Sequence, residues 1–136
     1  MRIVLDTNIV VSALLFAGTP LKILRLCSNK HSLLSSPYLL SELDDVFNRP
    51  KFHSKLKQIN LTPASILIAY AKQVSLVNPA VIPSICRDHA DNHVLACALE
   101  AKADLIVSGD DDLLTLQSFR SIPIKNASDA LHLIEL

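Results

Sequence analysis

The 136-residue sequence has only two glycines, no tryptophan and few aromatic residues of any kind. So little glycine excludes collagen-like repeats and glycine-rich linkers. Net charge is also absent, because thirteen basic residues balance thirteen acidic ones, and half of the residues are hydrophobic. A disordered chain shows the opposite combination, low hydrophobicity with high net charge. The composition therefore indicates one globular domain over residues 1–136, long enough to bury a core of its own.

Cysteine is also scarce, and its pattern does not suggest a disulfide framework. Cys27, Cys86 and Cys97 are odd in number and form no CxxC pair, which is typical of free thiols in a reducing cytosol. No apolar run approaches the roughly 18 residues of a membrane-spanning helix. The apolar stretch 9–17 follows Asp6 and is not followed by an A-x-A cleavage site, unlike a signal peptide. We expect a cytoplasmic protein without a membrane association.

Short apolar runs alternate with longer amphipathic segments along the chain. The short runs predict buried strands at 3–5, 32–35, 105–107 and 122–125, with a strand remnant at Ile85. Helical spacing predicts helices over 9–16, 20–27, 38–47, 62–76, 88–102 and 111–116, and a last helix capped by Ser128 that ends at Ile134. Alternation of this kind is typical of a mainly parallel sheet covered by helices on both faces. The expected fold class is therefore α/β, a three-layer α/β/α sandwich.

Acidic residues from separate parts of the chain fall near the carboxyl ends of the expected strands. Ligands bind beyond this edge in open parallel sheets. Asp6 follows the first strand, and Asp110 to Asp112 follow a later one. Glu42 lies in the helix after the second strand, and Asp88 and Asp91 begin a helix whose N-terminus is expected at the same edge. Acids from four segments are thus expected to converge on one rim.

Such a cluster of acids is unfavourable without a counter-charge. Two carboxylates about 4 Å apart repel by about 4 kcal/mol at an effective dielectric constant of about 20. A bound divalent cation removes this repulsion, and carboxylate ligands without thiolates favour Mg²⁺ or Mn²⁺. Such ions clamp a phosphate, activate water and stabilise a leaving oxygen. Asp88 is equally well explained as a helix cap, so the candidate site residues are Asp6, Glu42, Asp91 and Asp110.

The motifs around these acids resemble a known family. They are Leu5-Asp6-Thr7-Asn8, Ser41-Glu42-Leu43, Asp91-Asn92-x-x-Leu95-x-x-Ala98 and Val107-Ser108-Gly109-Asp110-x-Asp112-Leu113. In their order and spacing they resemble the PIN-domain nucleases, and most of all the bacterial and archaeal branch known as toxins of toxin–antitoxin systems. The resemblance covers Arg2 to about Leu114. It implies a Rossmann-like α/β/α sandwich that cleaves single-stranded or structured RNA with Mg²⁺ or Mn²⁺.

The resemblance also implies roles for individual residues. Asp6, Asp91 and Asp110 would hold the metal, and Asp112, a frequent fifth acid, would support a second ion or orient a water molecule. Glu42 would anchor water beside the metal and assist in removing its proton. Asn8 and Ser108 match positions where the family keeps a small polar side chain near the metal. His89-Ala90 departs from the more usual Pro-Asp before the third acid, which removes one nearby carboxylate.

Other functions match the sequence less well. A haloacid dehalogenase-type phosphatase requires aspartate where this chain has Asn8, and a receiver domain needs adjacent acids near Asp6, although Lys125 could be its lysine. A zinc site at His89 and His93 lacks further ligands at suitable spacing. Metal-free cleavage through the RNA 2′-hydroxyl would need histidines as acid and base. A non-catalytic RNA- or protein-interaction module with a vestigial acidic site is the remaining alternative.

A basic stretch follows the Glu42 helix and contains no acid: Arg49, Lys51, His53, Lys55 and Lys57. It is either a solvated face or a contact for RNA phosphates beside the acidic rim. Bound divalent ions would offset the acids, so zero net charge does not exclude RNA. The resemblance further implies a homodimer and a cognate antitoxin protein. An apolar surface between Leu14 and Leu26 is one candidate for such contacts.

Overall fold

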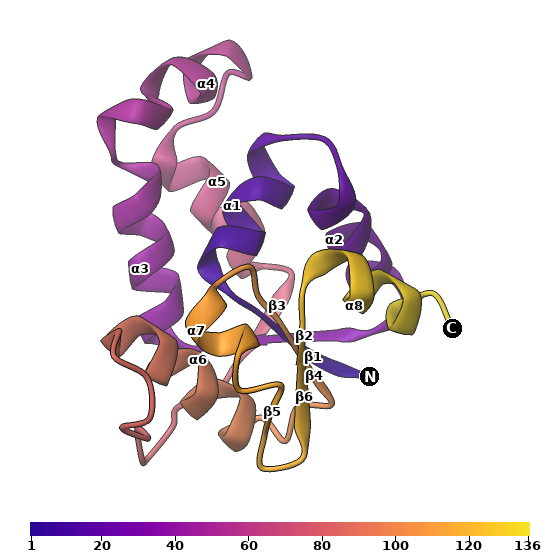
Figure 1. Ribbon diagram of the computed structural model, residues 1–136. Helices are drawn as coiled ribbons and strands as arrows, with labels where there is room; N and C mark the ends of the chain where they lie inside the picture. Colours follow the sequence, from indigo (N-terminus) through magenta and orange to yellow (C-terminus); the bar gives the residue numbers. More distant parts are fainter.

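The computed structural model describes residues 1–136, and a six-stranded sheet lies at its centre (Figure 1). The strand order is β3-β2-β1-β4-β6-β5. All neighbours pair in parallel except β5, which pairs antiparallel with β6. The strands are β1 (Arg2–Leu5), β2 (Ser32–Ser35), β3 (Val74–Leu76), β4 (Leu105–Val107), β5 (Ser118–Phe119) and β6 (Ile122–Lys125).

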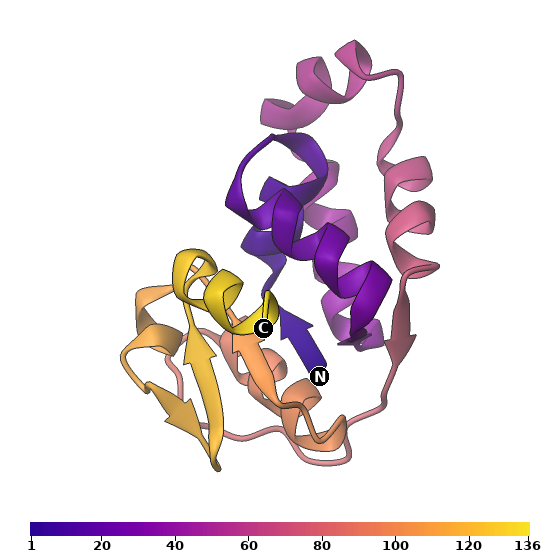
Figure 2. The same ribbon diagram turned by 90° about the vertical axis from the view of Figure 1, so that its right-hand side faces the viewer.

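Helices cover both faces of this sheet (Figure 2). They are α1 (Thr7–Leu15), α2 (Thr19–Lys30), α3 (Pro37–Phe47), α4 (His53–Gln58), α5 (Pro63–Ala71), α6 (His89–Glu100), α7 (Asp111–Leu114) and α8 (Ala127–Ile134), with a short 3-10 helix at Pro50–Phe52. Successive residues of a strand point to opposite faces. Ile3 and Leu5 therefore pack in the core formed with α1, α2, α3, α5 and α8, whereas Val4 packs in the core formed with α6 and α7. This arrangement confirms the expected α/β/α sandwich.

Parallel pairing brings the carboxyl ends of the central strands together. Leu5 of β1 pairs with Val107 of β4, and the Asp6 N–H donates to the Val107 carbonyl at 2.9 Å. Strands β1, β2 and β4 are each followed by a residue that caps a helix: Asp6 caps α1, Ser36 caps α3 and Asp110 caps α7. Short polar side chains suit these caps because their oxygens accept from free backbone N–H groups. The N-termini of these helices therefore gather at one edge of the sheet.

The structure corrects three expectations about secondary structure. The helix expected to reach Leu76 ends at Ala71, and Val74–Leu76 forms strand β3 instead. The apolar residues at 74 and 76 suit either structure, and pairing with β2 decides between them. Ile85 is not in a strand, and its N–H donates to the side chain of Asn92. The last helix is capped by Asn126 rather than Ser128.

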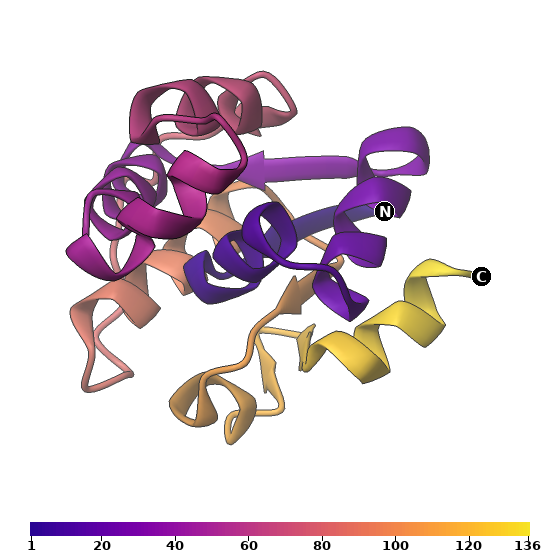
Figure 3. The same cartoon turned by 90° about the horizontal axis from the view of Figure 1, so that it is seen from above.

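The basic stretch forms an element that the sequence analysis did not predict. The 3-10 helix and α4 connect α3 to α5 and rise beyond the sheet at the top of Figure 1. In α4, Leu56 is the only buried residue, and it packs into the larger core. Viewed from above (Figure 3), α2 and α8 lie at the opposite end, near both chain termini.

No single helix is long and apolar enough to cross a membrane. Only α1 and α2 together reach the necessary length and composition, and they are bent by 97° relative to each other.

Candidate metal centre

Asp6 lies at the centre of the rim and is almost completely buried, with 6% of its surface exposed. Its Oδ1 accepts from the Thr7 N–H and its Oδ2 accepts from the Ser108 hydroxyl, both at 2.7 Å. Burial raises the pKa of Asp6 above its ordinary value, whereas these two hydrogen bonds lower it. Both carboxylate oxygens are therefore held in fixed positions.

Ser108 connects the acid after β1 to the acids after β4. Its side chain is fully buried, donates to Asp6 and accepts from the Asp110 N–H at 3.0 Å. Asp110 Oδ1 in turn accepts from the Asp112 N–H at 2.8 Å, as an N-cap of α7 does. A continuous set of hydrogen bonds thus runs from Asp6 to Asp112 and fixes the backbone that carries three of the candidate acids.

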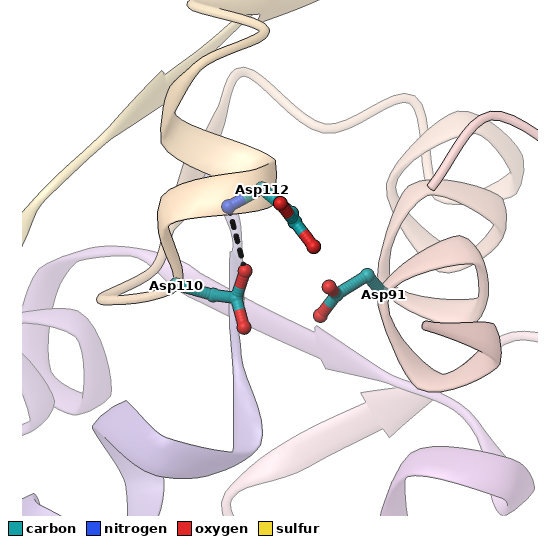
Figure 4. Close-up of side chains that lie close together, drawn as sticks. All are labelled: Asp91, Asp110 and Asp112. Carbon is teal, nitrogen blue, oxygen red and sulfur yellow. Dashed lines mark hydrogen bonds between the residues drawn. The ribbon is translucent and has the colours of Figure 1, made fainter. Parts of the chain in front are cut away.

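Asp91, Asp110 and Asp112 form the tightest group of carboxylates. One oxygen from each lies within 4.8 Å of the other two. Figure 4 shows Asp91 projecting from α6 towards the two side chains at the start of α7. This spacing lets one cation contact several carboxylate oxygens, directly or through water.

Asp91 has a buried carboxylate oxygen without a hydrogen bond. The side chain is 4% exposed, and its Oδ2 is the only buried side-chain polar atom in the structure without a hydrogen bond. Burial, together with the charges of Asp110 and Asp6, raises the pKa of Asp91 to about 7. Buried carboxylates are normally hydrogen-bonded or bound to a cation. The donor set, which consists of carboxylate oxygens, fits a hard divalent cation.

Glu42 reaches the same pocket from α3. It is half-buried, and its Oε1 accepts a hydrogen bond from the Thr7 hydroxyl. The structure therefore brings the four acids from four segments to one pocket, whereas Asp112 belongs to the adjoining carboxylate group. The pocket is lined by Asp6, Thr7, Asn8, Glu42, Val46, Arg49, Asp88, Ala90, Asp91 and Asp110.

The supporting polar and basic residues take different positions. Asn8 is exposed and lines the pocket, whereas Ser108 lies beneath it. Of the basic stretch, only Arg49 lines the pocket. The Lys51 Nζ lies 5.0 Å from the centre of the Phe52 ring, and the Lys55 Nζ lies 5.2 Å from the centre of the Phe16 ring. Lys57 lies on α4, outside the pocket lining.

Two residues that the sequence analysis did not select hold the loop before α6. The Asn92 Oδ1 accepts from the N–H groups of Ile85 and Cys86, and its Nδ2 donates to the Cys86 carbonyl. Arg87, which follows Cys86 in this loop, donates from Nη2 to Asp112 Oδ1 at 2.9 Å. The position of Asn92 directly after Asp91 suggests a role near the site, but the sequence does not show which loop residues its side chain contacts.

Comparison with known proteins identifies a family, a sequence relative and a structural relative of this chain. The sequence model of a family described as PIN domain matches residues 2–112, a segment that contains all five candidate acids. An uncharacterized protein of Methanocaldococcus jannaschii is 34% identical over 119 residues, which are 86% of this chain and 76% of that protein. The structural relative is a chain in the crystal structure of VapBC2 from Rickettsia felis bound to a DNA fragment from its promoter. The two chains are 16% identical and superpose with a TM-score of 0.64, and the match covers 93% of this chain and 98% of that one. This last likeness concerns the fold.

Proposed function

The chain belongs to the PIN-domain family of nucleases, and on that premise we propose that it is a metal-dependent endoribonuclease that acts as the toxin of a toxin–antitoxin pair. The observation that carries the proposal is the group of Asp91, Asp110 and Asp112, together with the buried Asp91 Oδ2 that lacks a partner. Helix capping accounts for Asp6 and Asp110, but it does not account for the buried Asp91 oxygen or for three carboxylates this close together. This group of carboxylates is well suited to a divalent cation that promotes hydrolysis of a phosphodiester.

We assign the cation as Mg²⁺ or Mn²⁺, held by Asp91, Asp110 and Asp112 with Asp6 beside them. When bound, such an ion neutralises the carboxylates, activates water and stabilises the charge that develops on the phosphate and the leaving oxygen. Thr7 and Ser108 fix both oxygens of Asp6, so its negative charge is already oriented beside this group of carboxylates. Preorganised charge of this kind is a major source of catalysis.

The other pocket residues have roles that follow from their positions. Glu42 is held by the Thr7 hydroxyl at the pocket wall and is placed to accept a proton from the attacking water. Arg49 lies on the same wall and offers donors that suit phosphate oxygens. Attack of water on phosphorus, with cleavage of the bond to the 3′ oxygen, leaves a 5′-phosphate and a 3′-hydroxyl.

Purified protein and labelled RNA test this function. We expect cleavage with Mg²⁺ or Mn²⁺, loss of cleavage after exhaustive chelation with EDTA, and loss of cleavage in Asp6→Asn with an unchanged fold. Asp111→Asn is the matched control, because this exposed aspartate in α7 lies outside the carboxylate group. Full activity of Asp6→Asn would contradict the assignment. A wild-type protein that binds RNA but never cleaves it would favour the non-catalytic module.

We also propose an antitoxin partner and a homodimer. The VapBC2 match supports the first. A hollow between α1 and α2, lined by Leu14, Leu21 and Leu24 on its apolar side, offers a surface for either contact. Co-purification with the product of a neighbouring reading frame, and loss of cleavage in that complex, test the antitoxin. Light scattering of the purified chain tests the dimer. The free thiols of Cys27, Cys86 and Cys97 are in keeping with a cytoplasmic location.

A further inference from the structure

Three aromatic rings gather where α3 and α6 begin. Tyr38 stacks on His93 with a centroid distance of 3.5 Å and an interplanar angle of 5°. The ring of His89 meets both of them edge-on, with interplanar angles of 87° to Tyr38 and 83° to His93. The Nε2 atoms of His89 and His93 are 3.1 Å apart, a hydrogen-bond distance. These contacts hold the Tyr38 ring in one orientation.

The ring cluster, defined as Tyr38, His89 and His93, borders the acidic pocket. Tyr38 lies four residues before Glu42 on α3, a spacing that places both on the same side of a helix. His89 directly follows Asp88 on α6. Since Glu42 and Asp88 line the pocket, the ring cluster lies beside the part of the pocket that these two residues form.

The packing of the protein does not account for this cluster. None of its rings belongs to either hydrophobic core, although Leu39, the neighbour of Tyr38, does. Tyr38 is 37% exposed, and His89 is also exposed. An exposed tyrosine ring that is already oriented can receive a flat ligand with little loss of conformational freedom. The cluster therefore has the properties of a binding platform.

We propose that Tyr38, supported by His93, is a stacking platform for one nucleobase of the RNA, next to the phosphate that is cleaved. Single-stranded RNA is commonly bound by stacking its bases on aromatic side chains, and every base offers a face for this. The contact suits an acidic rim because a neutral base is not repelled by carboxylates as the phosphate backbone is. This inference rests on the proposed endoribonuclease function and adds a base-binding subsite to it.

Binding of short single-stranded oligoribonucleotides, measured by fluorescence anisotropy with Ca²⁺ in place of Mg²⁺, tests the platform. We expect Tyr38→Ala and Tyr38→Leu to weaken binding by about 5- to 150-fold, the range for one lost base stack. Tyr38→Phe keeps the ring and should bind within about twofold of wild type. Leu133→Ala, which removes an equally exposed side chain on α8, is the matched control. Circular dichroism and melting curves establish that each variant is folded.

Abasic substitution separates stacking from an indirect effect on the fold. Replacing successive bases of the oligonucleotide by abasic sites should reveal one position at which wild type loses affinity and Tyr38→Ala loses nothing further. The chain has no tryptophan, and its other tyrosine, Tyr70, is fully buried. A change of tyrosine emission on RNA binding, absent in Tyr38→Phe, would therefore report directly on the platform.

The possible outcomes are distinct. Wild-type affinity in Tyr38→Ala, or an equal loss of affinity at every abasic position, would overturn the platform and leave the nuclease proposal standing. A wild-type protein that neither binds nor cleaves RNA would overturn both.

Discussion

Arg87 donates from Nη2 to Asp112 Oδ1 at 2.9 Å, which makes the only ion pair of the structure a contact with a candidate metal ligand. The arginine side chain is 88% exposed, so the pair adds little to the stability of the fold. The pair is important instead for cation binding, because it occupies an oxygen of a candidate metal ligand. A cation that binds Asp112 through this oxygen must compete with the guanidinium.

We expect Arg87→Ala to bind Mg²⁺ a few-fold more tightly than wild type in the absence of RNA, because Asp112 then has no competing partner. Isothermal titration calorimetry measures this directly. Arg120→Ala is the control, since Arg120 lies in the turn between β5 and β6 and packs over Phe119 instead. Weaker Mg²⁺ binding in Arg87→Ala would show that the arginine supports the metal site rather than competing for it.

Ser108→Ala should lower both stability and activity. The hydroxyl is fully buried and bonds to both Asp6 and the Asp110 N–H, and leaving such groups unpaired costs about 1–3 kcal/mol in the free energy of unfolding. Cleavage should fall as well, because Asp6 loses one of the bonds that fix it. Ser35→Ala, a buried serine at the end of β2, is the matched control for denaturation by urea. Equal losses in the two variants would contradict the assigned role of Ser108.

The metal-free protein should lose stability as the pH rises. Asp91 has a pKa of about 7 in the folded protein, against an ordinary value of 3.8, so the fold binds more protons than the unfolded chain between these values. This contribution is complete below about pH 4 and is lost as the pH passes 7. Asp91→Asn cannot ionise, so its melting temperature in EDTA should rise relative to wild type from pH 4 to 8. A constant difference between the two proteins would contradict the raised pKa.

Over the same range, Mg²⁺ should bind wild type more tightly as the pH rises, because the cation requires the ionised carboxylate. Calorimetric titrations at pH 6 and 8 measure this trend.

Basic residues before and within α4 should contribute to RNA binding. Each lost phosphate contact reduces the slope of log affinity against log salt by about 0.7 for a single strand. We expect such a reduction for Arg49→Ala, together with slower cleavage, because Arg49 lines the pocket. The double change Lys55→Ala and Lys57→Ala should flatten the slope without changing the maximal cleavage rate. An unchanged salt slope in the double variant would show that the lysines of α4 face solvent and do not contact RNA.

Much of the site was predictable because its residues directly follow strands. Asp6 and Asp110 lie just beyond β1 and β4, and parallel pairing necessarily brings those strand ends together. The sequence does not specify contacts between side chains of distant segments. The stack of Tyr38 on His93 and the pair of Arg87 with Asp112 arise only when α3, α6 and α7 meet.

The same limit explains the error at β3. Residues 74–76 suit a helix or a strand by their own pattern, and only their pairing with β2 selects the strand. The helix at 53–58 was missed because Leu56 is its single buried residue, which leaves no apolar periodicity to detect.

Analysis of the RNA ends tests the central claim most directly. Wild-type protein would be incubated with a 5′-labelled RNA and Mg²⁺, and the products compared with and without EDTA by gel electrophoresis and phosphatase treatment. Hydrolysis driven by the carboxylate-bound cation predicts 5′-phosphate and 3′-hydroxyl ends that disappear on chelation. Cleavage that persists in EDTA, with 2′,3′-cyclic phosphate ends, would contradict it.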